Sequence, residues 1–408
     1  MSEASAHTPG ERPAGAEGSP RDPLPANVKL LGCVSLLNDV ASEMIYPLLP
    51  QFLLTVLGGN LRLLGLIEGV ADSVGSLLKL WSGGWSDRAG RRKPFIILGY
   101  SIPALARPLL SLATAPWQLF ALRVSDRIGK GLRTAPRDAL IADSTAPEFR
   151  GRAFGFHRAL DHLGAAIGPL IALAFLAIWP GEMRTLFALA LLPGLAVTAL
   201  VLWGLREKRA SAAASTKLQL SLEPLGGRFQ LFMLALVLFT LGNSSDMFLL
   251  VRSQQLGVPV EMLPLLWCAF HVVKSAVNLI AGRVTDAIGP RPLIFVGWLL
   301  YGLVYLAFAL ATAAWHAWAL FLAYGVVYAL TEPAEKTLVA GLVGAERKGL
   351  AFGWFNFAIG VAALPSSVIF GYLYDVFGPL AAFGWGAALA VVAALLVTFI
   401  RIDAPRAA

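Results

Sequence analysis

The chain of 408 residues is 57% hydrophobic and only 14% charged, and its mean hydropathy is +0.68. A soluble globular domain carries about a quarter of its residues as charges, so that class is excluded. Several apolar runs reach the roughly 20 residues that an α-helix needs to cross the hydrocarbon core. The composition therefore predicts an all-α polytopic membrane protein embedded in a lipid bilayer.

The net charge of +8 is concentrated in alternate loops and in one central segment. The basic residues concerned are Arg88, Arg91, Arg92, Lys93, Arg150, Arg152, Arg206, Lys208, Arg209, Lys217, Arg228, Arg347, Lys348, Arg401 and Arg406. This alternation predicts that the basic loops and both termini are cytoplasmic, in a multi-pass protein of the cell inner membrane. Nucleic acid is not expected as a partner, because no basic surface is interleaved with aromatic residues.

In chain order, the apolar runs predict twelve transmembrane spans in two groups of six. The first group covers 28–57, 61–84, 94–115, 116–143, 149–178 and 184–204. The second covers 229–256, 260–284, 291–312, 316–343, 347–375 and 378–401. Residues 1–26 lack the apolar core of a signal peptide and predict a disordered cytoplasmic tail. The polar segment 205–228 predicts a cytoplasmic linker between bundles 27–204 and 229–401, and 402–408 a second cytoplasmic tail.

The second span of each group is followed by a similar basic segment, so the segment occurs twice in the chain. It reads Gly83-Gly-Trp-Ser-Asp87-Arg88-Ala-Gly90-Arg91-Arg92-Lys93-Pro94, and then Gly282-Arg-Val-Thr-Asp286-Ala-Ile-Gly289-Pro-Arg291-Pro292. We expect each copy to be a short turn between two membrane helices. Further echoes pair Ser42-Glu43-Met44 with Ser245-Asp246-Met247, and Ala153-Phe154-Gly155 with Ala351-Phe352-Gly353. Together they predict two pseudo-symmetric six-helix bundles.

The Gly-x-x-x-Asp-Arg-x-Gly-Arg-Arg pattern resembles the signature loop between helices 2 and 3 of the major facilitator superfamily of transporters. The likeness extends over residues from about 28 to 401. It implies a secondary transporter for a small-molecule substrate, in which Asp87, Arg88 and Arg91 fasten cytoplasmic helix ends in the outward-facing state. Gly83, Gly90 and, in the second copy, Asp286 complete the implied gating loop.

Many ionisable residues lie at membrane depth in the first half, where a central Asp, Lys or Arg costs roughly 2.5–3.5 kcal/mol. They are Asp39, Glu43, Glu68, Asp72, Lys79, Arg123, Asp126, Arg127, Lys130, Arg133, Arg137, Asp138, His157, Arg158, Asp161 and His162. A spacing of four residues puts Asp39 with Glu43, and Glu68 with Asp72, on one helix face each. We expect these charges to line a hydrated cavity, to pair with one another, or both.

A carboxylate in apolar surroundings holds a proton near neutral pH, whereas a nearby arginine displaces that proton. A carboxylate that alternates between the two surroundings can carry protons. The residues assigned to proton coupling are Asp39, Glu43, Glu68, Asp72, Arg123 and Asp161. An ion-pair lattice that only locks helices together is the alternative, above all for Arg133, Arg137 and Arg158.

Two further segments resemble motifs of the superfamily. Arg123-Val-Ser-Asp126-Arg127-Ile-Gly129 is similar to Arg-x-x-Gln-Gly-x-Gly, which implies that Arg123 tunes a coupling carboxylate. Gly164-Ala-Ala-Ile-Gly168-Pro169 is similar to the Gly-x-x-x-Gly-Pro antiporter motif of exporters. Physically, Gly164 and Gly168 allow close helix contact and Pro169 allows a bend, so ordinary packing is the other interpretation.

The second half has fewer buried polar candidates, namely Asn243, Asp246, His271, Lys274, Asn278, Glu332 and Glu335. Across both halves, the candidate substrate-binding residues are Asn38, Arg127, His157, Asp246, His271 and Lys274. His157 and His162 lack the companions that a metal site needs, so neither a metal nor a cofactor is expected.

Together these features favour a monomeric, proton-coupled efflux antiporter. The alternative is uptake or exchange of an anionic solute on the basic stripe of the span 116–143, with metal or metal-chelate export as a further variant. An enzyme is not expected, because the chain has no Ser-His-Asp grouping, metal-ligand spacing or phosphate-binding loop.

Overall fold

The computed structural model describes residues 24–146, 149–207, 225–343 and 347–400. The first half contains α1 (Ala26–Glu43), α2 (Leu49–Gln51), α3 (Leu61–Ala89), α4 (Lys93–Leu109), α5 (Pro116–Asp143), α6 (Arg150–Ile178), α7 (Met183–Leu189) and α8 (Leu191–Ala199). Short helical turns extend several of these: η1 (Tyr46–Leu48), η2 (Phe52–Val56), η3 (Leu110–Leu112) and η5 (Leu200–Gly204).

The second half contains α9 (Gly226–Gly242), α10 (Met247–Gln255), η7 (Val260–Met262), α11 (Leu263–Ile288), α12 (Pro290–Leu310), α13 (Ala314–Leu342), α14 (Lys348–Phe377) and α15 (Pro379–Thr398). The predicted all-helical fold is confirmed. The predicted tails and linker lie outside the described residues, apart from 24–26, 205–207 and 225–228.

Within the described residues, nine helical segments are long and apolar enough to cross a membrane. The remaining predicted spans correspond to α3, α5 and α1 with its continuation through η2. These are the helices that carry most of the ionisable residues found in the sequence, and charged side chains lower their mean hydropathy.

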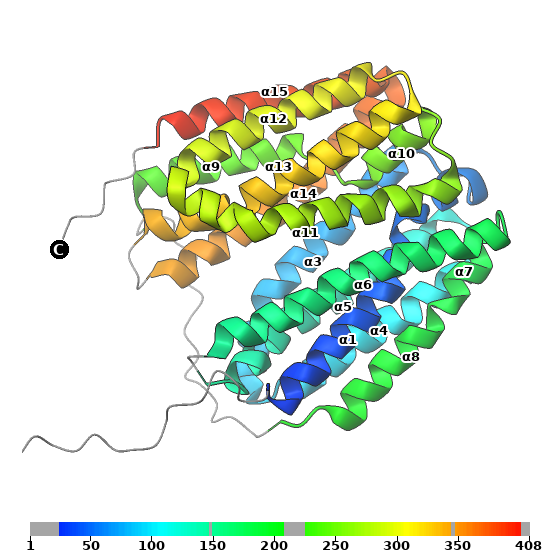
Figure 1. Cartoon of the computed structure of the whole chain (residues 1–408), viewed down its shortest axis with the longest axis vertical. Coiled ribbons are helices and arrows are strands. Elements are labelled where there is room, and N and C mark those ends of the chain that lie inside the picture. The colour runs from blue at the N-terminus through cyan, green and yellow to red at the C-terminus, as the bar shows by residue number, and fades with distance from the viewer. Residues whose placement is uncertain (1–23, 147–148, 208–224, 344–346, 401–408) are drawn as a thin grey trace, which may run out of the picture.

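The two halves pack against each other through exchanged pairs of helices. Helix α3 lies along α14, and α6 lies along α11. Helices α3 and α11 form the second membrane span of their halves, and α6 and α14 form the fifth. The interface therefore has the two-fold character that the repeated motifs predict. In Figure 1 the two groups of ribbons diverge toward the end at which the chain enters α1 and leaves α15.

Three predicted spans are interrupted, the sixth only at Ala190 between α7 and α8. The first helix ends at Glu43, and the chain continues through η1, α2 and η2, where Pro47 and Pro50 prevent a regular ladder. The seventh span breaks between α9 and α10 at residues 243–246. The break leaves the backbone carbonyl of Asn243 outside the hydrogen-bond ladder of its own helix. The hydroxyl of Ser366 on α14 donates to this carbonyl at 2.9 Å, so a neighbouring helix satisfies it.

The repeated basic motif is mostly helical, which corrects the prediction of a turn. Helix α3 continues to Ala89, so Gly83, Asp87 and Arg88 lie on its last turns. The reversal begins at Gly90, whose φ of 58° is left-handed and suits glycine. In the second copy Asp286 likewise lies on α11, and the chain reverses at Gly289 with φ of 88°.

Helices α1 and α6 approach closely at the Gly164-to-Pro169 motif. A Cβ atom added to Gly164 would lie 2.4 Å from the carbonyl oxygen of Leu36, and one added to Gly168 would lie 2.7 Å from that of Val40. Only glycine fits this backbone contact. This is the close packing that the spacing of the two glycines predicts.

Candidate functional site

The charges at membrane depth pair in register between α3 and α5. Arg123 donates to Glu68 through Nε at 2.7 Å and Nη2 at 3.0 Å. One helical turn further on, Arg127 Nε lies 3.1 Å from Asp72 Oδ1. Because both residue numbers advance by four, α3 and α5 run parallel here and their charged faces match. We call the pair Glu68–Arg123 the first rung and the pair Asp72–Arg127 the second rung.

The first rung belongs to a buried network that joins four helices. The side chains of Glu68 and Arg123 are 1% and 5% exposed. Arg123 also lies 3.5 Å from Asp126, and Arg107 on α4 donates to Asp126 at 2.8 Å. Arg107 further donates to the backbone and side-chain oxygens of Asn38 on α1, at 2.9 and 3.0 Å. Two arginines and two acids therefore neutralise one another away from solvent.

Arg107 was missed by the sequence reasoning. It stands alone in the apolar segment between Pro103 and Pro108, so no helical spacing connects it to another charge. The available signal was the charge itself: a lone arginine in an apolar span requires a buried acid. Asn38, a candidate substrate-binding residue, accepts hydrogen bonds from Arg107 in this structure.

The second rung is accessible. The side chain of Asp72 is 38% exposed, and Arg127 is its ion-pair partner. Next to it on α5, Lys130 is exposed although it lies midway along a membrane helix. The positive charges of Arg127 and Lys79 repel the Lys130 ammonium, and the negative charge of Asp39 attracts it. Within the described residues, neither Lys79 nor Lys130 has an ion-pair partner within 4 Å.

Asp39 on α1 and Asp161 on α6 lie where these two helices pack together. Asp39 accepts a hydrogen bond from the adjacent Asn38 amide at 2.8 Å, and the negative charge of Asp161 acts on it electrostatically. Asp161 accepts from the Ser35 hydroxyl, and His157 Nδ1 lies 3.6 Å from it. His157 is buried on α6, beside Asp161 rather than on an open surface.

Glu43 takes part in the contact between the halves. Its Oε2 accepts from the indole N–H of Trp267 on α11 at 2.8 Å, and the Trp267 ring lies 5.0 Å from that of Tyr46. Ser245 Oγ donates to Glu68 at 3.3 Å, and Arg62 pairs with Asp375 at 2.6 Å. Bonds across the interface thus connect the break in α9–α10, the end of α1 and the start of α3.

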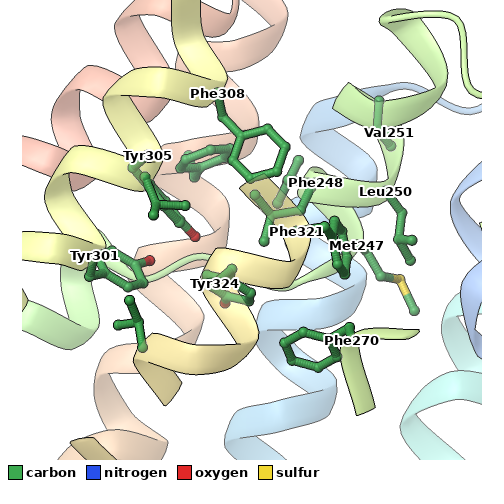
Figure 2. Packing of buried hydrophobic residues seen from close by; sticks show 14 of the residues in the cluster. Met247, Phe248, Leu250, Val251, Phe270, Tyr301, Tyr305, Phe308, Phe321 and Tyr324 are labelled. Carbon is green, nitrogen blue, oxygen red and sulfur yellow. The ribbon is translucent and has the colours of Figure 1, made fainter. Parts of the chain in front are cut away.

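The second half presents a tyrosine cluster beside the break at 243–246. Figure 2 shows Tyr301 and Tyr305 on α12 and Tyr324 on α13 among the packed rings of this half. The hydroxyl of Tyr324 donates to Asp246 at 2.5 Å, and that of Tyr301 donates to Asn243 at 3.0 Å. These tyrosines were missed as well, although their four-residue spacing on α12 was visible in the sequence.

His271 and Lys274 have different surroundings. His271 packs edge-on against Trp267 and Phe270. The ammonium of Lys274 lies 5.0 Å from the centre of the Tyr328 ring and 3.6 Å from Glu332. Lys274 therefore lies between an aromatic face and a carboxylate, whereas His271 packs among aromatic rings.

The gating motif is tied together by Arg92. Its guanidinium lies 2.6 Å from Asp143 at the end of α5 and 3.4 Å from Asp87. Glu207, just after η5, accepts from the backbone N–H groups of Arg92 and Lys93. Asp87 therefore pairs with Arg92, and the role of Asp87, Arg88 and Arg91 in fastening the helix ends stays a prediction.

Comparisons with known proteins identify the architecture. A family model described as Major Facilitator Superfamily matches residues 31–273 and again 231–408. The chain is 33% identical over 383 residues to an uncharacterized MFS-type transporter of Methanocaldococcus jannaschii, covering 92% of this chain and 95% of the relative. A shorter match, 33% over 137 residues, links 34% of each chain with the multidrug resistance protein MdtH of Photorhabdus laumondii.

A solved structure shares the fold at lower identity. The D-xylose-proton symporter superposes with a TM-score of 0.73 and 17% identity, over 92% of this chain and 97% of that one. The matches to the family model and to the archaeal relative extend over nearly the whole chain. The chain belongs to the Major Facilitator Superfamily and is a multi-pass secondary transporter rather than an enzyme.

Proposed function

We propose that the protein is a proton-coupled exporter, an antiporter that exchanges protons for a small solute across the cell inner membrane. The partial similarity to a multidrug resistance protein supports export, as does the close α1–α6 contact at Gly164 and Gly168. The alternation of basic loops supports cytoplasmic termini. The chain acts as a monomer in this proposal.

The observation that carries the proposal is the division of the acids into two kinds. Glu68 and Asp126 are buried, and each lies against an arginine that is itself bound on its other side. Such acids hold helices together as members of buried ion pairs. Asp72 is accessible and has one arginine partner, and among the described residues the Asn38 amide is the one hydrogen-bond donor to Asp39. We therefore assign proton exchange to Asp72 and Asp39, and a structural role to Glu68 and Arg123.

Exchange at Asp72 would couple to solute because the proton and the solute bind the same carboxylate. When Asp72 is ionised, it lies 3.1 Å from the Arg127 guanidinium, and its accessible side can accept a hydrogen bond or a positive charge from the solute. When Asp72 takes up a proton, its negative charge is lost and the solute is no longer attracted to it. Solute and proton would then compete for the same rung, which is the requirement for antiport.

A vesicle experiment tests this proposal. A solute that stabilises the purified protein in a broad thermal-shift panel is added to proteoliposomes that contain a pH-sensitive dye. We expect the wild type and Glu68→Asp to move protons in response to solute, and Asp72→Asn and Asp39→Asn to lose the response. Undiminished proton movement in both asparagine variants would overturn the assignment.

A second candidate is transport of an anionic solute, which the unpaired lysines favour. Lys79 and Lys130 both feel the positive charge of Arg127. The acid that acts on Lys79 is Asp72, and the acid that acts on Lys130 is Asp39. Three cations from the two neighbouring helices α3 and α5 would bind a carboxylate or phosphate well. Loss of stabilisation by organic anions in Lys130→Gln, with retention in Lys130→Arg, would select this function.

A further inference from the structure

A pocket of about 560 Å³ lies where α4 begins and η5 ends, and none of its lining residues belongs to the charged pairs of α3 and α5. Its apolar part is formed by Pro94, Ile97 and Leu205, and its polar rim is formed by Arg91, Lys93, Arg206 and Glu207. Apart from Arg91, which the family resemblance places in the gating loop, these residues have no part in the proposed proton exchange. The pocket therefore requires its own explanation.

Two of the rim charges, Glu207 and Lys93, already bind backbone groups at the helix ends. The carboxylate of Glu207 accepts from the first N–H groups of α4, including that of Lys93 at 3.0 Å. In return, the ammonium of Lys93 donates to the last carbonyls of the preceding segment, Leu202 at 3.0 Å and Leu205 at 2.7 Å. Each charge thus compensates an opposite helix end.

The other two rim charges are left over. Arg91 and Arg206 are exposed, and within the described residues neither guanidinium has a hydrogen bond or an ion-pair partner. The pocket therefore carries a local excess of two positive charges. An anion in it would meet two guanidinium groups, whose fork geometry suits a phosphate diester.

The depth of the pocket indicates which anion reaches it. It lies at the ends of two membrane helices, and the neighbouring Trp203 is 83% exposed. Exposed tryptophan at a helix end marks the level of the lipid headgroups. Below it, Leu98 of α4 and Leu202 of η5 are exposed on the outside of the bundle. A ligand with a phosphate head and apolar tails fits this sequence of surfaces.

We propose that this pocket is a binding site for the headgroup of an anionic phospholipid, with its phosphate between Arg91 and Arg206. The lipid would connect the turn after α3 to the end of the first six-helix bundle. Basic residues at the membrane surface attract anionic lipids by about 1 kcal/mol each, which corresponds to roughly five-fold in affinity per arginine. The site is independent of transport direction and of the coupling ion.

The test uses the purified full-length chain in micelles containing equal amounts of phosphatidylglycerol and phosphatidylcholine. Native mass spectrometry counts the lipids that stay bound. We expect the wild type to retain phosphatidylglycerol preferentially, and Arg91→Gln/Arg206→Gln to lose about 25-fold of that preference. The matched control Arg150→Gln/Arg283→Gln removes two exposed charges near the same end of the molecule and should keep it, as should Arg91→Lys/Arg206→Lys.

Three results would overturn the proposal. The wild type could show no preference between the two lipids, or the double glutamine variant could retain the preference. Alternatively, inorganic phosphate could displace phosphatidylglycerol at equal concentration, which would make the pocket a site for soluble phosphate. Both arginines lie at the surface, so the variants fold, and size-exclusion chromatography checks this.

Discussion

The buried rung between Arg123 and Glu68 provides a stability test with an internal control. Arg123→Gln would leave Glu68 with only the Ser245 hydroxyl at 3.3 Å, while Asp126 keeps Arg107 at 2.8 Å. The loss therefore falls on one uncompensated carboxylate. Breaking a buried pair in this way costs about 3–5 kcal/mol in free energy of unfolding.

The same substitution one turn later is the control. Arg127→Gln removes the partner of an accessible acid, and exposed pairs contribute only about 0–1 kcal/mol. In Glu68→Gln/Arg123→Gln both charges are gone, so most of the loss should be recovered. The interaction free energy from this double-mutant cycle should exceed about 2 kcal/mol.

The assay is denaturant unfolding of the detergent-solubilised protein, followed by circular dichroism. Equal losses for Arg123→Gln and Arg127→Gln, or a cycle without interaction energy, would refute the division of the two rungs into buried and accessible pairs. That outcome would also remove the reason for assigning proton exchange to Asp72 rather than to Glu68.

Three further predictions follow from single contacts. Gly164→Val places a side chain against a carbonyl of α1 and should destabilise the protein by about 1–3 kcal/mol or more, seen as a lower melting temperature, whereas Gly155→Ala meets open space and should change little. Glu207→Gln weakens the cap on α4 and should cost about 0.5–2 kcal/mol; an unchanged melting temperature would contradict this role. Trp267→Phe removes the N–H donor to Glu43, a bond that joins the two halves at the C-terminal end of α1. The variant should populate a state in which the halves separate at this end, measured as a longer spin-label distance between them. An unchanged distance distribution would mean that this bond does not hold the halves together there.

Most of the fold could be predicted from the sequence, because apolar length and repeated motifs are local properties. The ends of α5 agree with the prediction to the residue. The break at 243–246 was not predicted, since Asn-Ser-Ser-Asp reads equally well as a polar helical turn. Whether such a stretch unwinds depends on partners from other helices, here Ser366 and Tyr328.

The candidate site was predicted in part. Spacing placed Glu68 with Asp72 on one face, and Arg123 with Arg127 on another. Which acid meets which arginine depends on the register of α3 against α5, which is a tertiary property. The same limit explains Arg107, whose partners lie on α1 and α5 and are separated from it in sequence.

The most direct test of proton–solute competition at Asp72 is the number of protons released when solute binds. Titration calorimetry of the purified protein in buffers of different ionisation enthalpy gives this number without a membrane. At a pH low enough to protonate Asp72 in the solute-free protein, we expect release to approach one proton per bound solute in the wild type, and none in Asp72→Asn. Proton release that is absent in the wild type, or unchanged in Asp72→Asn, would contradict coupling through the Asp72–Arg127 rung.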